Sequence, residues 1–271
     1  MRIGLIAGGG PFPELFLKKA IEKGYKVFVV AYINEADQIL KEIADSITWM
    51  HLGQISRLIK FFKKNMVKDA VMLGTIKKTR IFSDIKPDFK ALAFFAKLKQ
   101  THDDSILTSF ANLIEKHGII VKPSTFLLPE LINKKGCWTK RKPSKTETQD
   151  IIAGWPIAKQ IGKFDVGQCI VVSNGAILAV EAIDGTDATI LRGGNLADKE
   201  TVVVKISKPN QDLRFDLPCT GCETIRIMHQ AGASTLVLEA EKSISFDRES
   251  MILLADKHGI CIQVMEDKDF S

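Results

Sequence analysis

Short apolar runs alternate with amphipathic segments along most of the chain, and a glycine often separates one from the next. In the first half, residues 13–23 show helical periodicity, Gly24 follows, and residues 26–31 form a run that is apolar throughout after Lys26. Strands buried on both faces are typically such runs, whereas helices show a period of 3.6 residues. The alternation predicts an α/β fold in which helices cover a mostly parallel sheet. The other predicted helix and strand pairs are 55–66 with 68–73, 103–117 with 119–121, 223–231 with 235–238, and 248–258 with 260–264.

The apolar positions also predict which face of each helix is buried. In the helix of residues 13–23, we expect one side to carry Leu15, Phe16, Ala20 and Ile21. The pattern is clearest over residues 103–117, where one face carries Ile106, Leu107, Phe110, Leu113 and Ile114. Residues of this kind on one face indicate a helix packed against a core.

A basic segment interrupts the pattern in the middle of the chain. Residues 134–145 contain six basic residues and no acidic ones, with Gly136 and Pro143 among them. This composition favours a solvated linker or hinge, with a nucleic-acid-binding arm as the alternative. We therefore predict two α/β domains with a cleft between them, where ligand sites are common. Their expected bounds are 1–133 for an N-terminal, Rossmann-like nucleotide-binding domain, 134–146 for the linker, and 147–271 for a C-terminal catalytic domain.

Composition indicates an ordinary globular protein with anionic partners. The 271 residues carry a net charge of +6 and a sequence pI near 9.0, which favours phosphates, nucleic acid or acidic lipid surfaces. No apolar run reaches the roughly 18 residues that span a bilayer, and the N-terminus lacks the pattern of a signal peptide. Five cysteines without a framework spacing fit a reducing compartment. These features predict a cytoplasmic protein.

Three carboxylates gather in the seven-residue run Glu181-Ala-Ile-Asp184-Gly-Thr-Asp187. Carboxylates this close raise one another's cost of ionisation unless a positive charge lies between them. Oxygen ligands of this kind suit Mg²⁺ or Mn²⁺. The run therefore predicts metal-assisted chemistry on a charged substrate.

A glycine-rich turn, Gly8-Gly9-Gly10, follows the first predicted strand and opens the first helix. Glycines let backbone N–H groups approach an anion, and the N-terminus of a helix adds positive potential. We expect this turn to contact a phosphate or nucleotide, with a plain strand-to-helix turn as the alternative. It fits a dinucleotide fingerprint poorly, because Pro13 takes the place of the third glycine and no acidic residue directly follows the second strand. A nicotinamide-dependent oxidoreductase is therefore the weaker alternative.

Charged residues after other predicted strands add candidates. Lys77 and Lys78 follow the strand of residues 68–73, where they could neutralise a phosphate or form a solvated pair. Asp103 and Asp104 begin a helix, and capping explains one of them while leaving room for a ligand role of the other.

The Pro-flanked loop of residues 208–218 has the charge density that holding a phosphate and a metal would need. Within it, Asp216 lies between two apolar residues, which favours partial burial and a perturbed pKa. A loop aspartate making local backbone hydrogen bonds is the alternative.

Two further features have plain explanations beside sharper ones. The lysine-interrupted apolar stretches 57–64 and 91–98 are most simply core helices, and contact with an acyl chain or a membrane surface is the alternative. The pair Cys219 and Cys222 precedes a helix, which can lower a thiol pKa. A lone pair of this spacing is weak evidence for structural zinc or for a redox role.

Taken together, the chain resembles the LpxI-type UDP-2,3-diacylglucosamine pyrophosphatases from residue 3 to about residue 265. The combination of Glu-Ala-Ile-Asp-Gly-Thr-Asp with the later Asp-Leu-Pro is quite specific. The chain departs locally at Thr101-His102, where the family pattern has Gly before the Asp pair, and at Gly193, where a second Arg often follows Arg192. The runs that carry the resemblance are 4–10, 164–168, 179–187, 191–192, 208–211 and 214–218.

The resemblance implies hydrolysis of UDP-2,3-diacylglucosamine to UMP and 2,3-diacylglucosamine 1-phosphate in lipid A synthesis. It implies a divalent metal, water attack on the phosphorus nearer the sugar, and a ligand between two domains. The family's important aspartate falls on Asp216. Binding of a UDP-sugar without hydrolysis is the alternative. No nucleic-acid partner is expected, and a peripheral contact with the inner-membrane surface and a homodimer are left open.

These arguments assign each candidate residue a role. The catalytic candidates are Asp216, Asp187 and Arg192, and the expected ligands of Mg²⁺ or Mn²⁺ are Asp216, Asp187, Glu181 and Asp184. Contacts to the substrate are predicted from Gly8, Gly9, Gly10, Thr75, Lys77, Asp104, Thr186, Lys208, Gln211 and Arg214.

Overall fold

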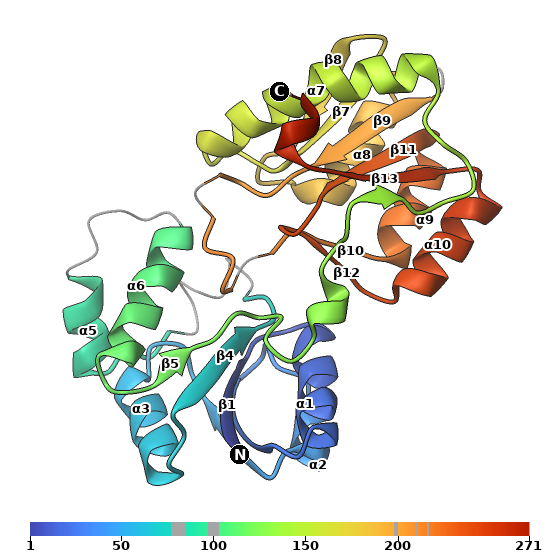
Figure 1. The fold of residues 1–271 in the computed structure, drawn as a ribbon. Helices are drawn as coiled ribbons and strands as arrows, with labels where there is room; N and C mark the ends of the chain where they lie inside the picture. Colours follow the sequence, from blue (N-terminus) through green and yellow to red (C-terminus); the bar gives the residue numbers. More distant parts are fainter. Residues whose placement is uncertain (77–84, 97–102, 198–199, 210, 216, 271) are drawn as a thin grey trace. The chain divides into compact units, whose positions relative to one another are not determined.

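The chain forms two compact units (Figure 1). The structure, a computed structural model, describes residues 1–76, 85–96, 103–197, 200–209, 211–215 and 217–270. Unit 1 contains Met1–Pro129 together with Asp212–Asp216, and unit 2 contains Glu130–Gln211 with Leu217–Ser271. Both units are α/β, as predicted. A short stretch late in the sequence therefore packs with the N-terminal unit.

Among the described residues, a sheet of five parallel strands forms the centre of unit 1. Its order is β3-β2-β1-β4-β5, so the chain turns back between β1 and β4. Ligands of such sheets bind outside the carboxyl ends of the strands at the point where the order reverses. The strands are β1 Arg2–Ala7, β2 Lys26–Tyr32, β3 Ser46–Met50, β4 Asp69–Leu73 and β5 Ile120–Val121.

Helices cover both faces of this sheet, with α1 and α2 on one face and α3, α5 and α6 on the other (Figure 1). Helix α1 buries Phe16, Leu17 and Ala20, whereas Leu15 and Ile21 are exposed. The predicted face of this helix was therefore wrong by part of a turn, because the buried positions follow the i, i+3, i+4, i+7 spacing from Pro13. The helices are α1 Phe12–Glu22, α2 Leu40–Ile43, α3 Ile55–Lys64, α5 Phe89–Phe95 and α6 Asp103–Glu115.

A mixed sheet forms the centre of unit 2, in the order β6-β13-β11-β9-β7-β8 among the described residues. The strands β9, β11 and β13 run parallel, and β6, β7 and β8 run antiparallel to their neighbours. A separate short pair joins β10 Cys219–Thr220 to β12 Ile244–Ser245. The sheet strands are β6 Gly136–Cys137, β7 Cys169–Ser173, β8 Ala176–Val180, β9 Thr201–Lys205, β11 Ala233–Glu239 and β13 Cys261–Met265.

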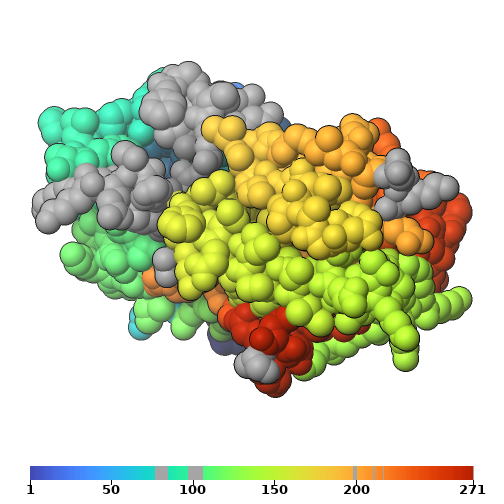
Figure 2. Space-filling model, turned by 90° about the horizontal axis from the view of Figure 1, so that it is seen from above, coloured from blue at the N-terminus to red at the C-terminus, as the bar shows by residue number. Residues whose placement is uncertain are grey.

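Alternate side chains of this sheet face two different sets of helices. Ile170 and Val172 of β7 pack with α7, whereas Cys169 and Val171 pack in the cluster that includes α8, α9 and α10. Helix α7 crosses its face of unit 2 in yellow-green, with the red C-terminal residues beside it (Figure 2). There Trp155 stacks on Phe270, with ring centroids 4.6 Å apart. The helices are α7 Lys145–Lys163, α8 Gly185–Gly194, α9 Cys222–Gln230 and α10 Arg248–Lys257.

The basic segment predicted as a linker, residues 134–146, lies within unit 2. Its residues Gly136–Cys137 form β6, which pairs with β13. Arg141 donates to both carboxylate oxygens of Glu147, at 2.7 and 2.8 Å. These contacts make the segment an edge of the second unit, and its positive charges are partly paired.

No helix in the described part of the chain is both long and apolar enough to cross a bilayer.

Candidate active site

Two tight turns meet at the carboxyl ends of β1 and β4, where the strand order of unit 1 reverses. Gly8 N–H donates to Leu73 O and Gly9 N–H donates to Thr75 O, both at 2.8 Å. A Cβ on Gly8 would lie 2.6 Å from Thr75 O, so a larger residue would force the turns apart. The N–H groups of Gly8 and Gly9, which we expected to approach an anion, are thus used to join the two turns.

Gly10 is the exposed member of the glycine turn. Its φ of +89° lies in the left-handed region that glycine adopts readily, and a Cβ there would meet open space. The next positions offer few donors, because Pro11 and Pro13 have no N–H group and Glu14 adds a negative charge in the first turn of α1. Any approach of a phosphate to this turn therefore depends on Gly10 and on the remaining N–H groups of the first helical turn.

The acidic run divides between a strand end and a helix start. Glu181 directly follows β8, Asp184 is the N-cap of α8, and Asp187 lies in the first turn of that helix. Gly185, with a φ of +83°, makes the bend between them. Carboxylates at a helix N-terminus are stabilised by the helix dipole, which offsets part of their mutual repulsion.

Two of these carboxylates are already hydrogen-bonded through both oxygens. Buried Glu181 accepts from the Thr186 hydroxyl at 3.0 Å and from Gln168 N–H at 3.2 Å. Asp184 accepts from Ala182 N–H at 3.1 Å and pairs with Arg192 at 3.0 Å. Both carboxylates therefore shape the local chain.

The described residues offer no ready-made group of three His, Cys, Asp or Glu side chains for a metal. Asp187 is exposed and bonds to no other described side chain. Mg²⁺ is usually held by one or two carboxylates together with substrate phosphates. Asp187 fits that pattern, whereas Glu181 and Asp184 would first have to give up existing partners.

The segment 212–215 is fixed to unit 1 by Arg214. The guanidinium donates to the Asp212 carboxylate through Nε and Nη2, with the closest contact at 2.8 Å, and to Glu115 of α6 at 3.0 Å. Ser124 N–H donates to Arg214 O at 2.8 Å, and Phe215 packs against the core of unit 1. Arg214, predicted as a substrate contact, therefore holds the chain that leads into Asp216.

The pKa values of Asp212 and Arg214 shift in the directions expected of a partly buried ion pair. Burial by itself raises the pKa of Asp212, but hydrogen bonds from Arg214 and Thr108 outweigh it and hold that pKa below its ordinary value. The hydrogen bond to Asp212 raises the pKa of Arg214. Both groups stay charged at neutral pH, so the contact persists over the working range.

The loop after β9 is closed by its own side chains. Buried Gln211 accepts from the Ser207 hydroxyl and from Lys208 N–H, both at 3.2 Å. Lys208 pairs with Asp165 at 2.7 Å. These two predicted substrate contacts shape the loop in the structure.

The cations predicted to contact phosphate differ in how easily they could exchange partners. Arg192 and Asp184 remain 43% and 38% exposed, and such surface pairs contribute about 0–1 kcal/mol. The ion pairs of Lys208 and Arg214 are more enclosed. Arg192 is thus the one of the three whose carboxylate a phosphate could replace at least cost.

Several predicted site residues lie outside the described part of the chain. They are Lys77, its neighbour Lys78, and Asp216. Asp104 lies in the first turn of α6, and its side chain is likewise not described.

Sequence reasoning did not single out two buried charged residues at the carboxyl ends of neighbouring strands in unit 2. Lys205, the last residue of β9, is 6% exposed and donates to Cys219 O at 2.9 Å. Glu239, the last residue of β11, is 1% exposed and accepts from Lys159, Lys242 and Ser207 N–H. A pattern in the sequence could have identified them, because each is a single charged residue at the end of an apolar run, as in Val-Val-Val-Lys205.

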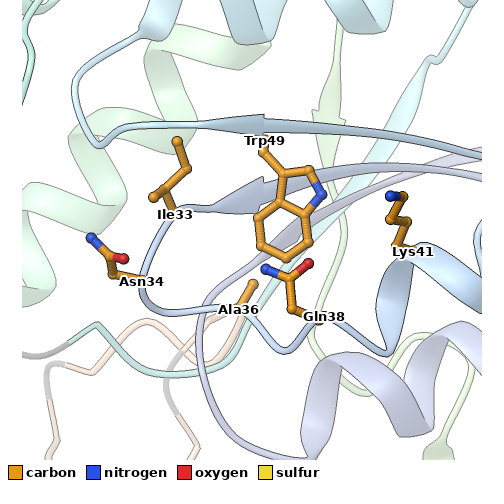
Figure 3. A pocket seen from close by; sticks show the side chains of 6 residues that line it. All are labelled: Ile33, Asn34, Ala36, Gln38, Lys41 and Trp49. Atoms are coloured by element: carbon orange, nitrogen blue, oxygen red, sulfur yellow. The ribbon is translucent and has the colours of Figure 1, made fainter.

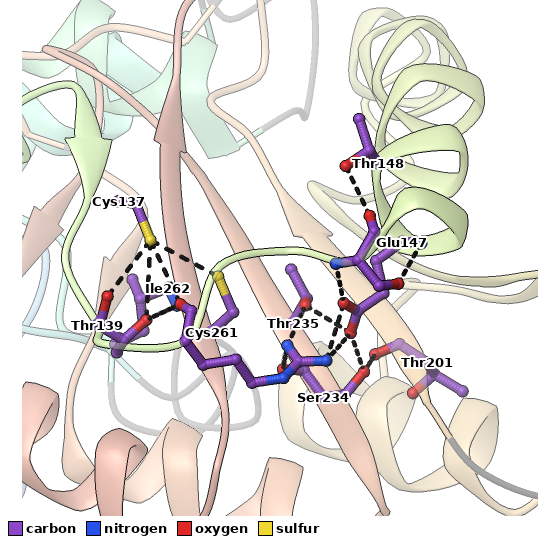
Figure 4. Close-up of polar contacts among 11 residues, drawn as sticks. Cys137, Thr139, Glu147, Thr148, Thr201, Ser234, Thr235, Cys261 and Ile262 are labelled. Atoms are coloured by element: carbon purple, nitrogen blue, oxygen red, sulfur yellow. Dashed lines mark hydrogen bonds and ion pairs between the residues drawn. The ribbon is translucent and has the colours of Figure 1, made fainter.

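The cysteines are free thiols in the structure. Cys219 lies in β10 and Cys222 begins α9. Elsewhere, the sulfur atoms of Cys137 and Cys261 lie 3.9 Å apart (Figure 4). Burial, with Cys137 beside it, raises the pKa of Cys261 to about 12, so this thiol is protonated and unreactive at neutral pH.

Comparison with known proteins matches both halves of the chain to one family. Residues 2–131 match the model of the LpxI N-terminal domain, and residues 134–263 match that of the LpxI C-terminal domain. The UDP-2,3-diacylglucosamine pyrophosphatase LpxI of Caulobacter vibrioides is 29% identical over an alignment 272 residues long, gaps included, which covers 96% of this chain and 96% of the relative.

Likenesses to solved structures are weak. CobK precorrin-6A reductase is 8% identical with a TM-score of 0.34, covering 98% of this chain and 88% of its own. Pal from Bacillus thuringiensis is 9% identical with a TM-score of 0.33, covering 98% and 86%. Scores this low support no inference about this chain.

Proposed function

The chain belongs to the LpxI family, and from this we infer that it is a UDP-2,3-diacylglucosamine pyrophosphatase. It hydrolyses the pyrophosphate bond of UDP-2,3-diacylglucosamine to UMP and 2,3-diacylglucosamine 1-phosphate, a step of lipid A synthesis. The observation that carries this inference is the match of both domain models, in order, over residues 2–131 and 134–263.

For the nucleotide, we propose that unit 1 acts as a Rossmann-like binding domain. The supporting observation is the reversal of strand order between β1 and β4, with Gly10 and Thr75 at the adjacent carboxyl ends. A pyrophosphate bound there would lie at the carboxyl ends of β1 and β4, beside the exposed Gly10. Gly8 and Gly9 support that site indirectly by joining the two turns.

For the phosphates, we propose that Asp187 and Asp216 hold Mg²⁺ or Mn²⁺. A bound divalent metal lowers the pKa of water and offsets charge on phosphoryl oxygens. Arg192 would turn from Asp184 to a phosphoryl oxygen, a contact suited to its planar fork. Buried Glu181 would keep the start of α8 in place through Thr186.

For the acyl chains and the lipid surface, we propose helix α5. Three apolar side chains spaced three residues apart, Phe89, Leu92 and Phe95, are 91%, 53% and 39% exposed, and Lys86 and Lys90 beside them are exposed. Apolar residues flanked by lysines suit an acidic lipid surface. Helix α3, the other lysine-interrupted stretch, is a core helix, as its buried residues Leu58, Ile59 and Phe62 show.

The deciding experiment is an assay of UMP release from UDP-2,3-diacylglucosamine by the purified protein, with Mg²⁺, with Mn²⁺ and after treatment with a chelator. We expect release that the chelator abolishes and that added metal restores. Absence of release with either metal would contradict the proposed activity, and binding without release would support the non-hydrolytic alternative. Release that persists in the chelator would contradict the metal.

The assignment of Asp216 needs its own variant. Asp216→Ala should lower turnover by more than a hundredfold while leaving the melting temperature unchanged, because removing a metal ligand or water-activating group removes the chemistry. Glu249→Ala, which removes an exposed carboxylate from α10, is the control and should keep full activity. Turnover of Asp216→Ala within a few-fold of the wild type would refute the role.

A further inference from the structure

A hollow lies at the carboxyl ends of β2 and β3 in unit 1, away from the residues assigned above. It is an open hollow of about 460 Å³, lined by Ile33, Asn34, Ala36, Gln38, Lys41 and Trp49. Pockets for small ligands typically measure roughly 300–1,000 Å³. The space therefore suits a group the size of a nucleoside.

The indole of Trp49 forms the broad wall of this hollow. It projects from β3 toward the loop that follows β2, and the amide of Gln38 lies beside it (Figure 3). A partly exposed indole offers a flat face, on which any nucleobase can stack. The side-chain amides of Gln38 and Asn34 carry both a donor and an acceptor, as does the imide edge of uracil.

The hollow lies at the right distance from the glycine turn for a nucleotide. Strands of a sheet are about 4.8 Å apart, so β3 lies about 10 Å from β1, roughly the reach from a nucleotide's phosphates to its base. The loop between them also contacts the turn, because Glu35 O lies 3.0 Å from where a Cβ on Gly9 would be. The loop that follows β2 therefore lies beside both the hollow and the glycine turn.

The charge of the hollow also favours a nucleotide. Among the described residues that line it, Lys41 is the charged one and none is acidic. An exposed lysine at this edge would attract the phosphates of a nucleotide without reading its base.

We propose that this hollow binds the uracil base of the substrate, with Trp49 as the stacking surface and Gln38 as the residue that reads the base edge. The inference rests on the proposed function and adds to it the residues that select the nucleotide. Thr75 and Gly10 would then face the phosphates, and Trp49 the base.

The test measures binding of UMP, CMP and ribose 5-phosphate to the whole protein by calorimetry. Trp49→Ala should weaken UMP binding about tenfold and leave ribose 5-phosphate unchanged, because the second ligand has no base to stack. Trp49→Phe should recover most of the affinity. Gln38→Ala, at an exposed position, should reduce the preference for UMP over CMP at least threefold. Trp138→Phe alters a partly buried tryptophan of unit 2 and is the control, with no expected change.

The proposal is overturned if Trp49→Ala and Gln38→Ala bind UMP with the affinity and selectivity of the wild type. It is also overturned if the wild type binds UMP and ribose 5-phosphate equally well. UMP release by the wild type is measured in parallel. If the wild type releases UMP but the variants bind UMP as the wild type does, the base site is refuted and the proposed function stands. Absence of release refutes the proposed function, and in that case a loss of UMP affinity in Trp49→Ala still supports the site.

Discussion

At the scale of single residues, Arg214 illustrates how a side chain two residues from a proposed catalytic residue could act through its neighbours. Its guanidinium is held by Asp212 and Glu115 and lies over the ring of Phe215, with 4.9 Å between the guanidinium carbon and the ring centroid. Few directions remain in which it could reach a phosphate. We therefore assign it a positioning role for the chain that enters Asp216.

Arg214→Lys tests this role. Lysine keeps the charge but cannot bond two carboxylates with a planar fork. We expect kcat for UMP release to fall about tenfold or more, with KM changed by less than threefold. Arg226→Lys alters an exposed pair with Glu223 and should change neither constant. A variant whose KM rises while kcat holds would instead indicate a direct contact between Arg214 and the substrate.

At the scale of elements, the start of α7 depends on one buried carboxylate. Ser144 caps the helix and Glu147 completes the capping box, and Arg141 also donates to Glu147. Ser234 and Thr235 donate to the same carboxylate (Figure 4). Burial alone raises the pKa of Glu147, but these hydrogen bonds outweigh it and lower the pKa from 4.5 to about 2. The same carboxylate thus joins the basic segment, α7 and β11.

The pKa of Glu147 predicts how stability depends on pH. Because the folded-state pKa is depressed, its contribution of about 3 kcal/mol is present above pH 4.5 and is lost as the pH falls toward 2. Glu147→Gln should lower the free energy of unfolding by about that amount at pH 7 and flatten its dependence between pH 4.5 and 2. Urea titrations at several pH values measure both effects.

Glu249→Gln, on the exposed surface of α10, is the control for that series and should match the wild type within about 0.5 kcal/mol. An unchanged pH dependence in Glu147→Gln would show that other carboxylates carry the acid sensitivity.

Elements with a strong local period were predicted well, and those without one were missed. The prediction for residues 248–258 is confirmed by α10 Arg248–Lys257, and that for 103–117 by α6 Asp103–Glu115. Helix α8 was missed because glycines lower helix propensity at both of its ends. Gly193 and Gly194 are there because a Cβ would lie 2.5 Å from Val171 and 2.1 Å from Ala231 O, contacts that only the tertiary structure reveals.

At the scale of the whole molecule, the exposed face of α5 is the part that we propose contacts the lipid surface carrying the substrate. A diacylated sugar nucleotide resides in a lipid surface, so an enzyme that binds that surface meets it at higher local concentration. Apolar side chains on α5 would insert while lysines contact acidic headgroups.

Replacing both Phe89 and Leu92 by Ser tests this surface. We expect partition onto vesicles with acidic lipids to fall about tenfold, while UMP release from substrate in detergent micelles stays within twofold of the wild type. Leu253→Ser, which changes a residue of α10 that is 70% exposed, is the matched control. Equal vesicle binding by all three proteins would exclude α5 as the contact.

The sequence by itself determined the α/β class, the alternation of helices and strands, the motifs of the family and the functional conclusion, because periodicity and motifs are local properties of the chain. The tertiary structure decided which residues far apart in the sequence contact one another. It paired Gly8 and Gly9 with the end of β4, joined Arg214 to Glu115, attached segment 212–215 to unit 1 and buried Lys205. Each of these contacts depends on where distant parts of the backbone meet. The free energy of the packed fold therefore determines which partner a charged side chain has, whereas the sequence alone gives only its position along the chain.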